Sequence, residues 1–164
     1  MADAHEIIPR LWLGNKRAAV NMEWLQMNNI NVVVNCSKDL PFADDTEVVR
    51  RRTYRIPIDD SLRECDINYL TTASEEVALT LLREYKSGAR ILVHCAAGMQ
   101  RSAASVSIFL MTLNHWPAEK TVEYIRSIRP IAFRPGINFL ASIQEYEHRL
   151  FTEILPAIGI SKHS

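Results

Sequence analysis

Several features that would assign this chain to a functional class are absent from its sequence. Its 19 Lys and Arg residues are balanced by 19 Asp and Glu residues, so it lacks the cationic excess of a general nucleic-acid or membrane-surface binder. It has only three cysteines, too few for a disulfide scaffold and without the paired short spacing of a zinc site. We therefore expect no metal, no cofactor, and no nucleic-acid or membrane partner.

Targeting and membrane segments are also absent. Residues 1–6, MADAHE, do not form a basic segment followed by an apolar one, so we expect no signal peptide. The longest stretch without Lys, Arg, Asp or Glu covers residues 102–118. Because it includes Ser, Thr, Asn, His and Pro, it predicts a buried helix rather than a membrane span. The few scattered cysteines favour a reducing intracellular location, in the cytoplasm or the nucleus.

The sequence does have what one folded domain needs. Its 164 residues fit one domain, and a hydrophobic fraction of 48% supplies a core. We expect that domain over residues 1–153, followed by a tail over residues 154–164. Short apolar runs predict strands at 6–9, 11–14, 30–36, 48–58 and 90–94, and helical periodicity predicts helices at 16–28, 67–85, 102–113, 117–128 and 137–153. This order predicts an α/β fold, a three-layer α/β/α sandwich around a mixed, mostly parallel sheet of about five strands.

One segment carries reactive side chains where a predicted strand meets a predicted helix. It covers residues 94–102 and reads HCAAGMQRS. In open α/β sheets, ligands bind beyond the carboxyl ends of the strands, and loop amides near a helix N-terminus favour an anion. Gly98 permits the turn, and the planar guanidinium of Arg101 matches two phosphate oxygens. The segment therefore predicts a phosphate-binding loop.

Cys95 begins this loop. The field that attracts an anion should also lower the pKa of its thiol and favour the nucleophilic thiolate, and Ser102 can donate a hydrogen bond to the sulfur. We expect His94 to shape the loop by hydrogen bonding rather than to transfer a proton. The alternatives are a structural cysteine before a helix cap, and a metal site at His94 and Cys95. The metal site is disfavoured because adjacent strand residues point to opposite faces.

The pattern His-Cys-x-x-Gly-x-x-Arg-Ser is the signature of cysteine-dependent phosphatases, and nearly all of the chain resembles the dual-specificity protein phosphatases. The segments that match this family in order are residues 8–15 (first hairpin), 34–41 (second strand and turn), 56–60 (general-acid loop) and 129–139 (support of the active-site loop). In size the chain is similar to small stand-alone members, including the poxvirus type. The resemblance implies a protein-tyrosine-phosphatase-like fold and a metal-independent enzyme that hydrolyses phosphotyrosine and phosphoserine or phosphothreonine in proteins.

The resemblance also implies roles for individual residues. Cys95 would attack phosphorus and form a phosphocysteine intermediate, and Ser102 would stabilise its sulfur. Backbone amides of the loop and the guanidinium would bind the phosphate oxygens. The substrate-binding residues would then be Ala96, Ala97, Gly98, Met99, Gln100 and Arg101.

Asp60 is the implied general acid, which protonates the leaving group and then activates water. Asp59 and Asp66 are the alternatives, and residues 61–65 resemble a small insertion in this loop. The residues expected to support the active-site loop are His94, Asn35 and Asn138.

Other substrate classes and a binding function are possible on the same fold. Uncharged side chains at positions 96, 97, 99 and 100 disfavour a phosphoinositide substrate, and the zero net charge disfavours an RNA 5′-triphosphatase. A non-catalytic phosphopeptide-binding pseudophosphatase is disfavoured because it would not need Cys95, Arg101 and Asp60 together. The oligomeric state is left open.

Two further hypotheses concern regulation and docking. Cys36 could form a reversible disulfide with Cys95, although a small buried hydrophobic role is favoured for it. The most basic run lies on the predicted strand 48–58 and consists of Arg50, Arg51, Arg52 and Arg55. A charged edge strand is favoured there, and a docking patch for an acidic or phosphorylated partner is the alternative. The arginines expected to flank the phosphate pocket are Arg126, Arg129 and Arg134.

Overall fold

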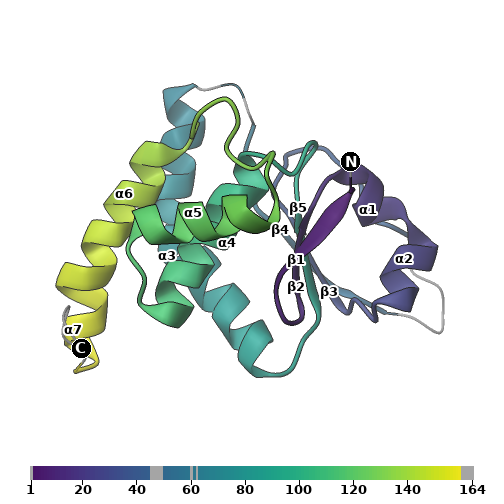
Figure 1. The fold of residues 1–164 in the computed structure, drawn as a ribbon, viewed down its shortest axis with the longest axis horizontal. Helices are drawn as coiled ribbons and strands as arrows, with labels where there is room; N and C mark the ends of the chain where they lie inside the picture. The colour runs from purple at the N-terminus through teal and green to yellow at the C-terminus, as the bar shows by residue number, and fades with distance from the viewer. Residues whose placement is uncertain (1, 45–49, 60, 62, 160–164) are drawn as a thin grey trace.

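A computed structural model of the chain describes residues 2–44, 50–59, 61 and 63–159. In this part of the chain one five-stranded sheet has the order β1-β2-β5-β3-β4 (Figure 1). Its strands are β1 (Ala4–Ile8), β2 (Leu11–Gly14), β3 (Val32–Asn35), β4 (Arg52–Arg55) and β5 (Ile91–His94). Only β1 is antiparallel to its neighbour, and the other three pairings are parallel. The predicted mixed, mostly parallel sheet is confirmed.

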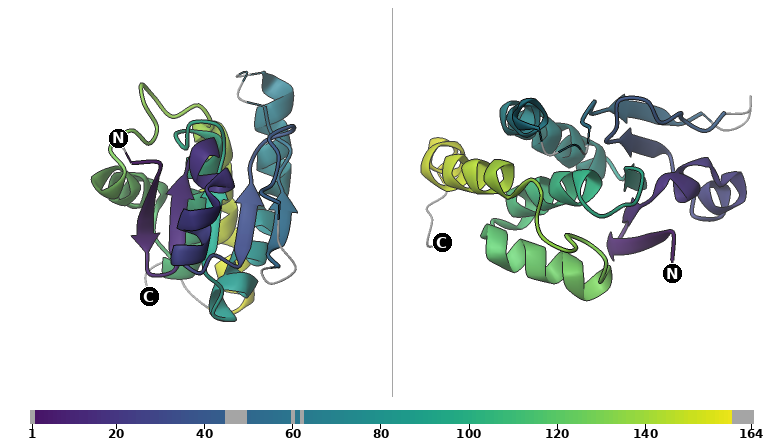
Figure 2. Two further views of the ribbon diagram at one scale, coloured as in Figure 1. Left: turned by 90° about the vertical axis from the view of Figure 1, so that its right-hand side faces the viewer. Right: turned by 90° about the horizontal axis from the view of Figure 1, so that it is seen from above.

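Helices cover both faces of this sheet (Figures 1 and 2). On one face lie α1 (Lys16–Val20) and α2 (Met22–Met27), and on the other lie α3 (Glu64–Lys86), α4 (Arg101–Asn114), α5 (Ala118–Ile128) and α6 (Leu140–Arg149). Successive side chains of β3 point to opposite faces of the sheet and so contribute to two hydrophobic cores. Val32 and Val34 pack in the larger cluster, and Val33 packs in the smaller one under α1 and α2. The three-layer prediction is confirmed.

Several predicted elements differ in their boundaries. Within the described residues, the strand predicted over residues 48–58 is limited to β4 (Arg52–Arg55), and the helix predicted over residues 67–85 begins at Glu64. The helix predicted over residues 16–28 is two helices, because Asn21 is extended (φ −85°, ψ 91°) and its side chain accepts the Trp24 amide proton as the N-cap of α2. The last helix continues beyond residue 153 through a π-helix, η1 (Leu150–Ile154), into α7 (Leu155–Ala157). Leu155 is buried, so the segment predicted as a tail begins packed on the core. Residues 160–164 of that segment lie outside the described residues.

Helix α4 is the centre of the larger layer. Every residue from Arg101 to Met111 is buried, and α4 packs against α3, α5 and α6. Its N-terminus follows β5 after a six-residue connection, residues 95–100. The fold therefore fixes the loop of residues 95–100 between a fully buried strand and a fully buried helix turn.

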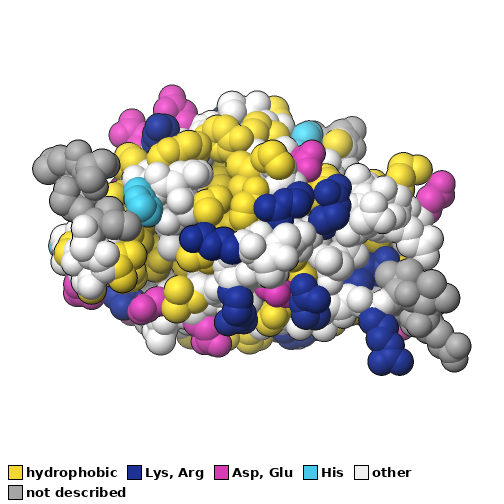
Figure 3. All heavy atoms as spheres, turned by 90° about the horizontal axis from the view of Figure 1, so that it is seen from below, with side chains coloured by type: hydrophobic (Ala, Val, Ile, Leu, Met, Phe, Trp, Pro, Cys, Tyr) yellow, Lys and Arg dark blue, Asp and Glu magenta, His cyan; other side chains and the backbone are white. Residues whose placement is uncertain are grey.

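The surface carries no broad field of one charge on the face seen from below in Figure 3, where Lys and Arg side chains are interspersed with hydrophobic and acidic ones. This agrees with the balanced composition. None of the helices in the described part of the chain combines the length and hydropathy that crossing a bilayer requires.

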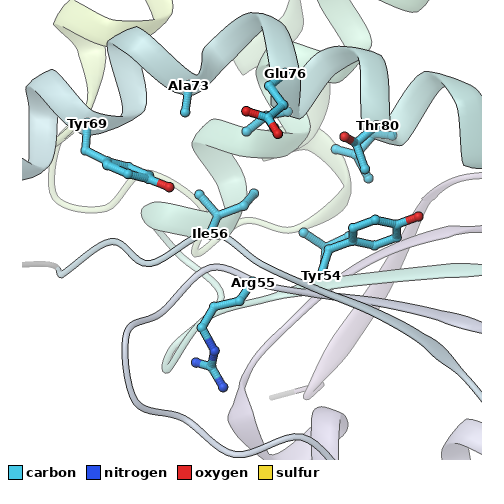
Figure 4. A pocket seen from close by; sticks show the side chains of 10 residues that line it. Tyr54, Arg55, Ile56, Tyr69, Ala73, Glu76 and Thr80 are labelled. Carbon is cyan, nitrogen blue, oxygen red and sulfur yellow. The ribbon is translucent and has the colours of Figure 1, made fainter.

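Strand β4 lies at the edge of the sheet, as the arginine run predicted. The Nε of Arg52 lies 2.7 Å from Oε2 of Glu84 on α3, and Arg55 donates to the carbonyls of Ser37 and Leu40. Tyr54 faces a hollow of about 120 Å³ between β4 and α3, whereas the guanidinium of Arg55 turns away from it (Figure 4). These contacts support the edge-strand interpretation more than a docking patch.

Candidate active site

The residue 95–100 loop depends on Gly98 for its path. Gly98 has φ +66°, and a Cβ placed on it would lie 2.5 Å from the carbonyl oxygen of Gly14 at the end of β2. Any side chain would therefore push the loop away from the sheet. The Lys16 amide donates to the Ala96 carbonyl at 3.1 Å, which ties the loop to the start of α1.

The thiol of Cys95 is buried, with 2% of the residue exposed. Its Sγ lies 3.1 Å from Oγ of Ser102. Burial alone would raise the pKa of this thiol, but hydrogen bonds from Ser102, the charge of Arg101 and the Gly98 amide hold the pKa below its ordinary value. The site therefore favours a thiolate, as predicted from the loop sequence.

The guanidinium of Arg101 extends from the first turn of α4 to the segment after β4. Its Nη1 donates to the carbonyl of Ile58 at 3.1 Å. Its buried Nε has no hydrogen-bond partner among the residues that the structure describes. Arg101 thus joins the loop to the predicted acid-loop segment and keeps a donor for an anion.

The fully buried Arg129 lies behind the loop, so it does not flank the pocket as the sequence suggested. Its Nε donates to the Gly98 carbonyl at 2.8 Å, and its Nη2 donates to the Ala97 carbonyl at 3.2 Å. Its Nη1 donates to the carbonyl of Ala2 and to Nδ1 of His5 in β1. Arg129 therefore turns two loop carbonyls away from the pocket, which leaves the loop amides for an anion.

Gln100 anchors the loop on its other side. Its Nε2 donates to the carbonyls of Gly136 at 2.7 Å and Arg134 at 3.1 Å, and its Oε1 accepts the Asn138 amide proton at 3.0 Å. The Phe133 amide donates to the Met99 carbonyl at 2.8 Å. The side chain of Gln100 thus supports the loop, and only its backbone is left for the predicted substrate binding.

His94 is fully buried, and its Nδ1 lies 3.4 Å from the Cys95 carbonyl oxygen. Burial lowers the pKa of its imidazole to about 4. The ring is therefore neutral near pH 7, which suits a shaping role better than proton transfer.

Cys36 and Asn35 lie on the strand next to β5. The Asn35 amide side chain donates to the Leu40 carbonyl at 2.8 Å and orders the turn after β3. Asn35 of β3 pairs with His94 of β5 in the sheet register. Cys36 and Cys95 are the next residues after these two strands, so they follow neighbouring strand ends. Burial raises the pKa of the Cys36 thiol to about 12. A reversible Cys36–Cys95 disulfide stays a prediction.

The predicted general acid, Asp60, lies outside the described residues. The alternative Asp59 is half-exposed, and its Oδ2 accepts from Nη2 of Arg63 at 3.1 Å. Asp66 has only 3% of its side chain exposed. Its carboxylate accepts the Asp59 amide proton at 3.1 Å and the Ser61 hydroxyl proton at 2.9 Å. It also forms an ion pair with Nζ of Lys38 at 3.3 Å. Asp66 therefore holds the chain on both sides of position 60.

The protonation state of Asp66 follows from these contacts. Burial acts to raise its pKa, but the hydrogen bonds from Asp59, Ser61 and Lys38 outweigh burial and hold the pKa below the ordinary range. A carboxylate that stays ionised and accepts three polar contacts is unsuited to donate a proton. Within the described residues, no group of three His, Cys, Asp or Glu side chains could hold a metal ion.

Comparison with known proteins identifies the family. The family model "Dual specificity phosphatase, catalytic domain" matches residues 11–149. The chain is 32% identical over 153 residues to Dual specificity phosphatase 28 of Mus musculus, covering 92% of this chain and 88% of that protein. It is also 30% identical over 144 residues to Dual specificity protein phosphatase 8 of Mus musculus, covering 88% of this chain.

The chain spans about a fifth of the length of the first curated relatives it matches, 21% in the case of Dual specificity protein phosphatase 8. Among solved structures, the crystal structure of human DUSP28 superposes with a TM-score of 0.79 at 27% identity, covering 92% of this chain and 96% of that chain. The fold, the loop geometry and the family match agree, and the chain belongs to the dual-specificity phosphatase family.

Proposed function

We propose that this protein is a metal-independent protein phosphatase that hydrolyses phosphotyrosine and phosphoserine or phosphothreonine. The observation that carries the proposal is the Cys95 thiol, with its pKa lowered by Ser102 and Arg101. It lies at the base of a loop whose carbonyls are drawn outward by Arg129. A nucleophile beside backbone amides that can bind phosphate oxygens is suited to attack on a phosphate monoester.

In the proposed reaction, the Cys95 sulfur attacks phosphorus in line with the leaving oxygen. A sulfur–phosphorus bond forms as the phosphorus–oxygen ester bond breaks, and Asp60 gives its proton to the leaving oxygen. Asp60 then takes a proton from water, which attacks phosphorus and releases inorganic phosphate. Ser102 stabilises the thiolate that leaves.

The contacts of Asp66 support Asp60 as the acid in preference to either alternative. Asp66 is occupied by hydrogen bonds, and Asp59 gives its amide proton to Asp66 and accepts from Arg63. The Arg101 contact with the Ile58 carbonyl links this segment to the phosphate loop. We propose that Asp66 is a positioning residue for the acid.

A phosphorylated protein is the proposed partner, and a reducing compartment, cytoplasm or nucleus, is the proposed location because the mechanism needs a free Cys95 thiol. Uncharged side chains at loop positions 96, 97, 99 and 100 offer no second cation to a multiply phosphorylated lipid. The protein substrate is therefore preferred to a phosphoinositide.

The test is hydrolysis of p-nitrophenyl phosphate in the presence of a metal chelator, with Cys95→Ser and Asp60→Asn as variants. We expect turnover by the wild type and none by Cys95→Ser. Undiminished turnover by Cys95→Ser would overturn the mechanism. Phosphotyrosyl and phosphothreonyl peptides, phosphoinositide vesicles and triphosphorylated RNA then identify the substrate class, and hydrolysis of RNA or lipid alone would contradict the protein assignment.

A further inference from the structure

A groove of about 300 Å³ opens beside the phosphate loop, on the side of the N-terminal hairpin. One wall is the outer side of the loop, with Ala96, Ala97 and Met99. The other wall is the start of α1, with Asn15, Lys16 and Arg17. Because Ala96, Ala97 and Met99 belong both to this groove and to the loop predicted to bind the phosphate, the groove adjoins the predicted substrate site.

The start of α1 is held rigidly against the loop. Asn15 is the N-cap, and its Oδ1 accepts the amide protons of Arg17 at 2.9 Å and Ala18 at 3.1 Å. The Lys16 amide donates to the Ala96 carbonyl at 3.1 Å. These bonds hold the backbone amides of Lys16 and Arg17 in place, and both side chains are exposed.

The charge of the groove is positive. Lys16 and Arg17 are both exposed, and within the described chain neither makes an ion pair, unlike Arg52, Arg63 and Arg149. The acidic residue Asp3 also lines the groove, but its Oδ1 accepts from Nδ2 of Asn15 at 3.0 Å. The buried Arg129 lines the groove as well, so three cationic side chains, two of them exposed, face one carboxylate.

We propose that this groove is a substrate subsite for an anionic side chain close in sequence to the phosphorylated residue, and that Lys16 and Arg17 determine this specificity. The proposal rests on the proposed phosphatase function and adds the substrate class to it. The occupant is a protein substrate with Asp, Glu or a second phosphorylated residue beside the reacting one. Such a subsite gives a neutral protein a local preference for acidic sequences, because the attraction depends on two nearby charges rather than on net charge.

The test compares kcat/KM for phosphotyrosyl peptides that differ only in their flanks: neutral, aspartate before, aspartate after, and phosphoserine at either position. The ratio of acidic to neutral kcat/KM is measured for the wild type and for Lys16→Glu/Arg17→Glu. A ratio within one preparation cancels any change in the folded fraction. Exposed ion pairs are weak, so we expect an acidic preference of roughly tenfold in the wild type at low salt, lost or reversed in the double variant.

The control is Arg83→Glu/Lys86→Glu, the same charge change at exposed positions in the last turn of α3. We expect it to keep the wild-type ratio. The milder Lys16→Gln/Arg17→Gln should give an intermediate ratio, and high salt should reduce the wild-type preference. An equal rate on neutral and acidic peptides by the wild type would overturn the proposal, as would a preference that survives in Lys16→Glu/Arg17→Glu or disappears equally in the control.

Two further outcomes have separate meanings. Dependence on Lys16 and Arg17 that occurs only with phosphoinositide vesicles would overturn the peptide subsite in favour of a lipid headgroup. Failure of the wild type to hydrolyse any of the peptides or p-nitrophenyl phosphate would instead overturn the phosphatase function itself.

Discussion

The Nε of Arg129 donates to the carbonyl oxygen of Gly98 at 2.8 Å, across 31 positions of sequence. The same guanidinium reaches the Ala97 carbonyl and, through Nη1, His5 of β1. One buried cation therefore joins the end of α5, the phosphate loop and the N-terminal strand. Its effect on chemistry is indirect, since it orients the loop that binds the substrate.

Arg129→Lys tests this positioning role. Lysine keeps the charge but cannot donate to several carbonyls from one planar group, so the loop carbonyls should rotate and the amides should lose their alignment. We expect kcat/KM for p-nitrophenyl phosphate to fall roughly a hundredfold, the size of effect seen when one preorganised donor is lost. The inhibition constant of inorganic phosphate should rise in parallel. A normal phosphate inhibition constant would show that Arg129 does not align the anion site.

Gly98→Ala should disrupt the same loop from its other side. The added Cβ would meet the Gly14 carbonyl at 2.5 Å, and the backbone would be held at φ +66°. We expect a loss of about 1–3 kcal/mol in the free energy of unfolding, measured by urea denaturation, together with loss of activity. The matched control is Gly136→Ala, because a Cβ there meets nothing within 4 Å. Equal stability of the two variants would contradict the close packing of loop and sheet.

The lowered pKa of Cys95 has a measurable consequence. The thiolate should persist at pH values below those at which an ordinary thiol protonates, so the rate of inactivation by iodoacetamide should reach half its plateau at a pH below that of a free cysteine. Ser102→Ala removes the hydroxyl 3.1 Å from Sγ, which should move that midpoint upward. A midpoint unchanged by Ser102→Ala would show that the Ser102 hydroxyl does not lower the pKa of Cys95.

Asp66→Asn tests the anchor of the acid loop. Asparagine keeps an acceptor but loses the charge that binds Lys38. We expect kcat to fall more for phenyl phosphate, whose leaving group needs a proton, than for p-nitrophenyl phosphate, whose leaving group needs one less. The two substrates should be affected equally if Asp66 acts only on stability.

The pH dependence of stability gives a second measurement on the same residue. Because the folded-state pKa of Asp66 is lowered, the carboxylate contributes stability above its unfolded value of 3.8 and loses that contribution as pH falls through the folded pKa. The difference in unfolding free energy between wild type and Asp66→Asn should therefore be largest above about pH 4 and shrink in stronger acid. A difference that is constant over this range would contradict the charged state.

The local chemistry of the site could be predicted because it is contiguous. Residues 94–102 hold the nucleophile, the turn glycine and the guanidinium in one segment, and strand alternation around Val33 and Leu92 specified which faces are buried. The break at Asn21 could have been predicted as well, since an asparagine three residues before Trp24 is a typical N-cap.

The resemblance predicted that residues 129–139 support the active-site loop, but the burial of Arg129 and its contacts with the loop carbonyls could not be predicted from sequence. A charged residue is expected at the surface, and its burial depends on carbonyls of residues 97 and 98 and on His5, all distant in sequence. The contacts of Asp66 could not be predicted either. The Asp59 amide and the Lys38 ammonium meet the Asp66 carboxylate only when α3 is packed in the fold.

The most direct test of the proposed mechanism is detection of the phosphocysteine intermediate at Cys95. Wild type and Asp60→Asn are mixed with p-nitrophenyl phosphate, quenched in acid during turnover, digested and analysed by mass spectrometry. We expect a phosphate adduct on the peptide that contains Cys95, at higher occupancy in Asp60→Asn because hydrolysis of the adduct there lacks a general base. Turnover with no adduct at Cys95, or with the adduct on another residue, would contradict this mechanism.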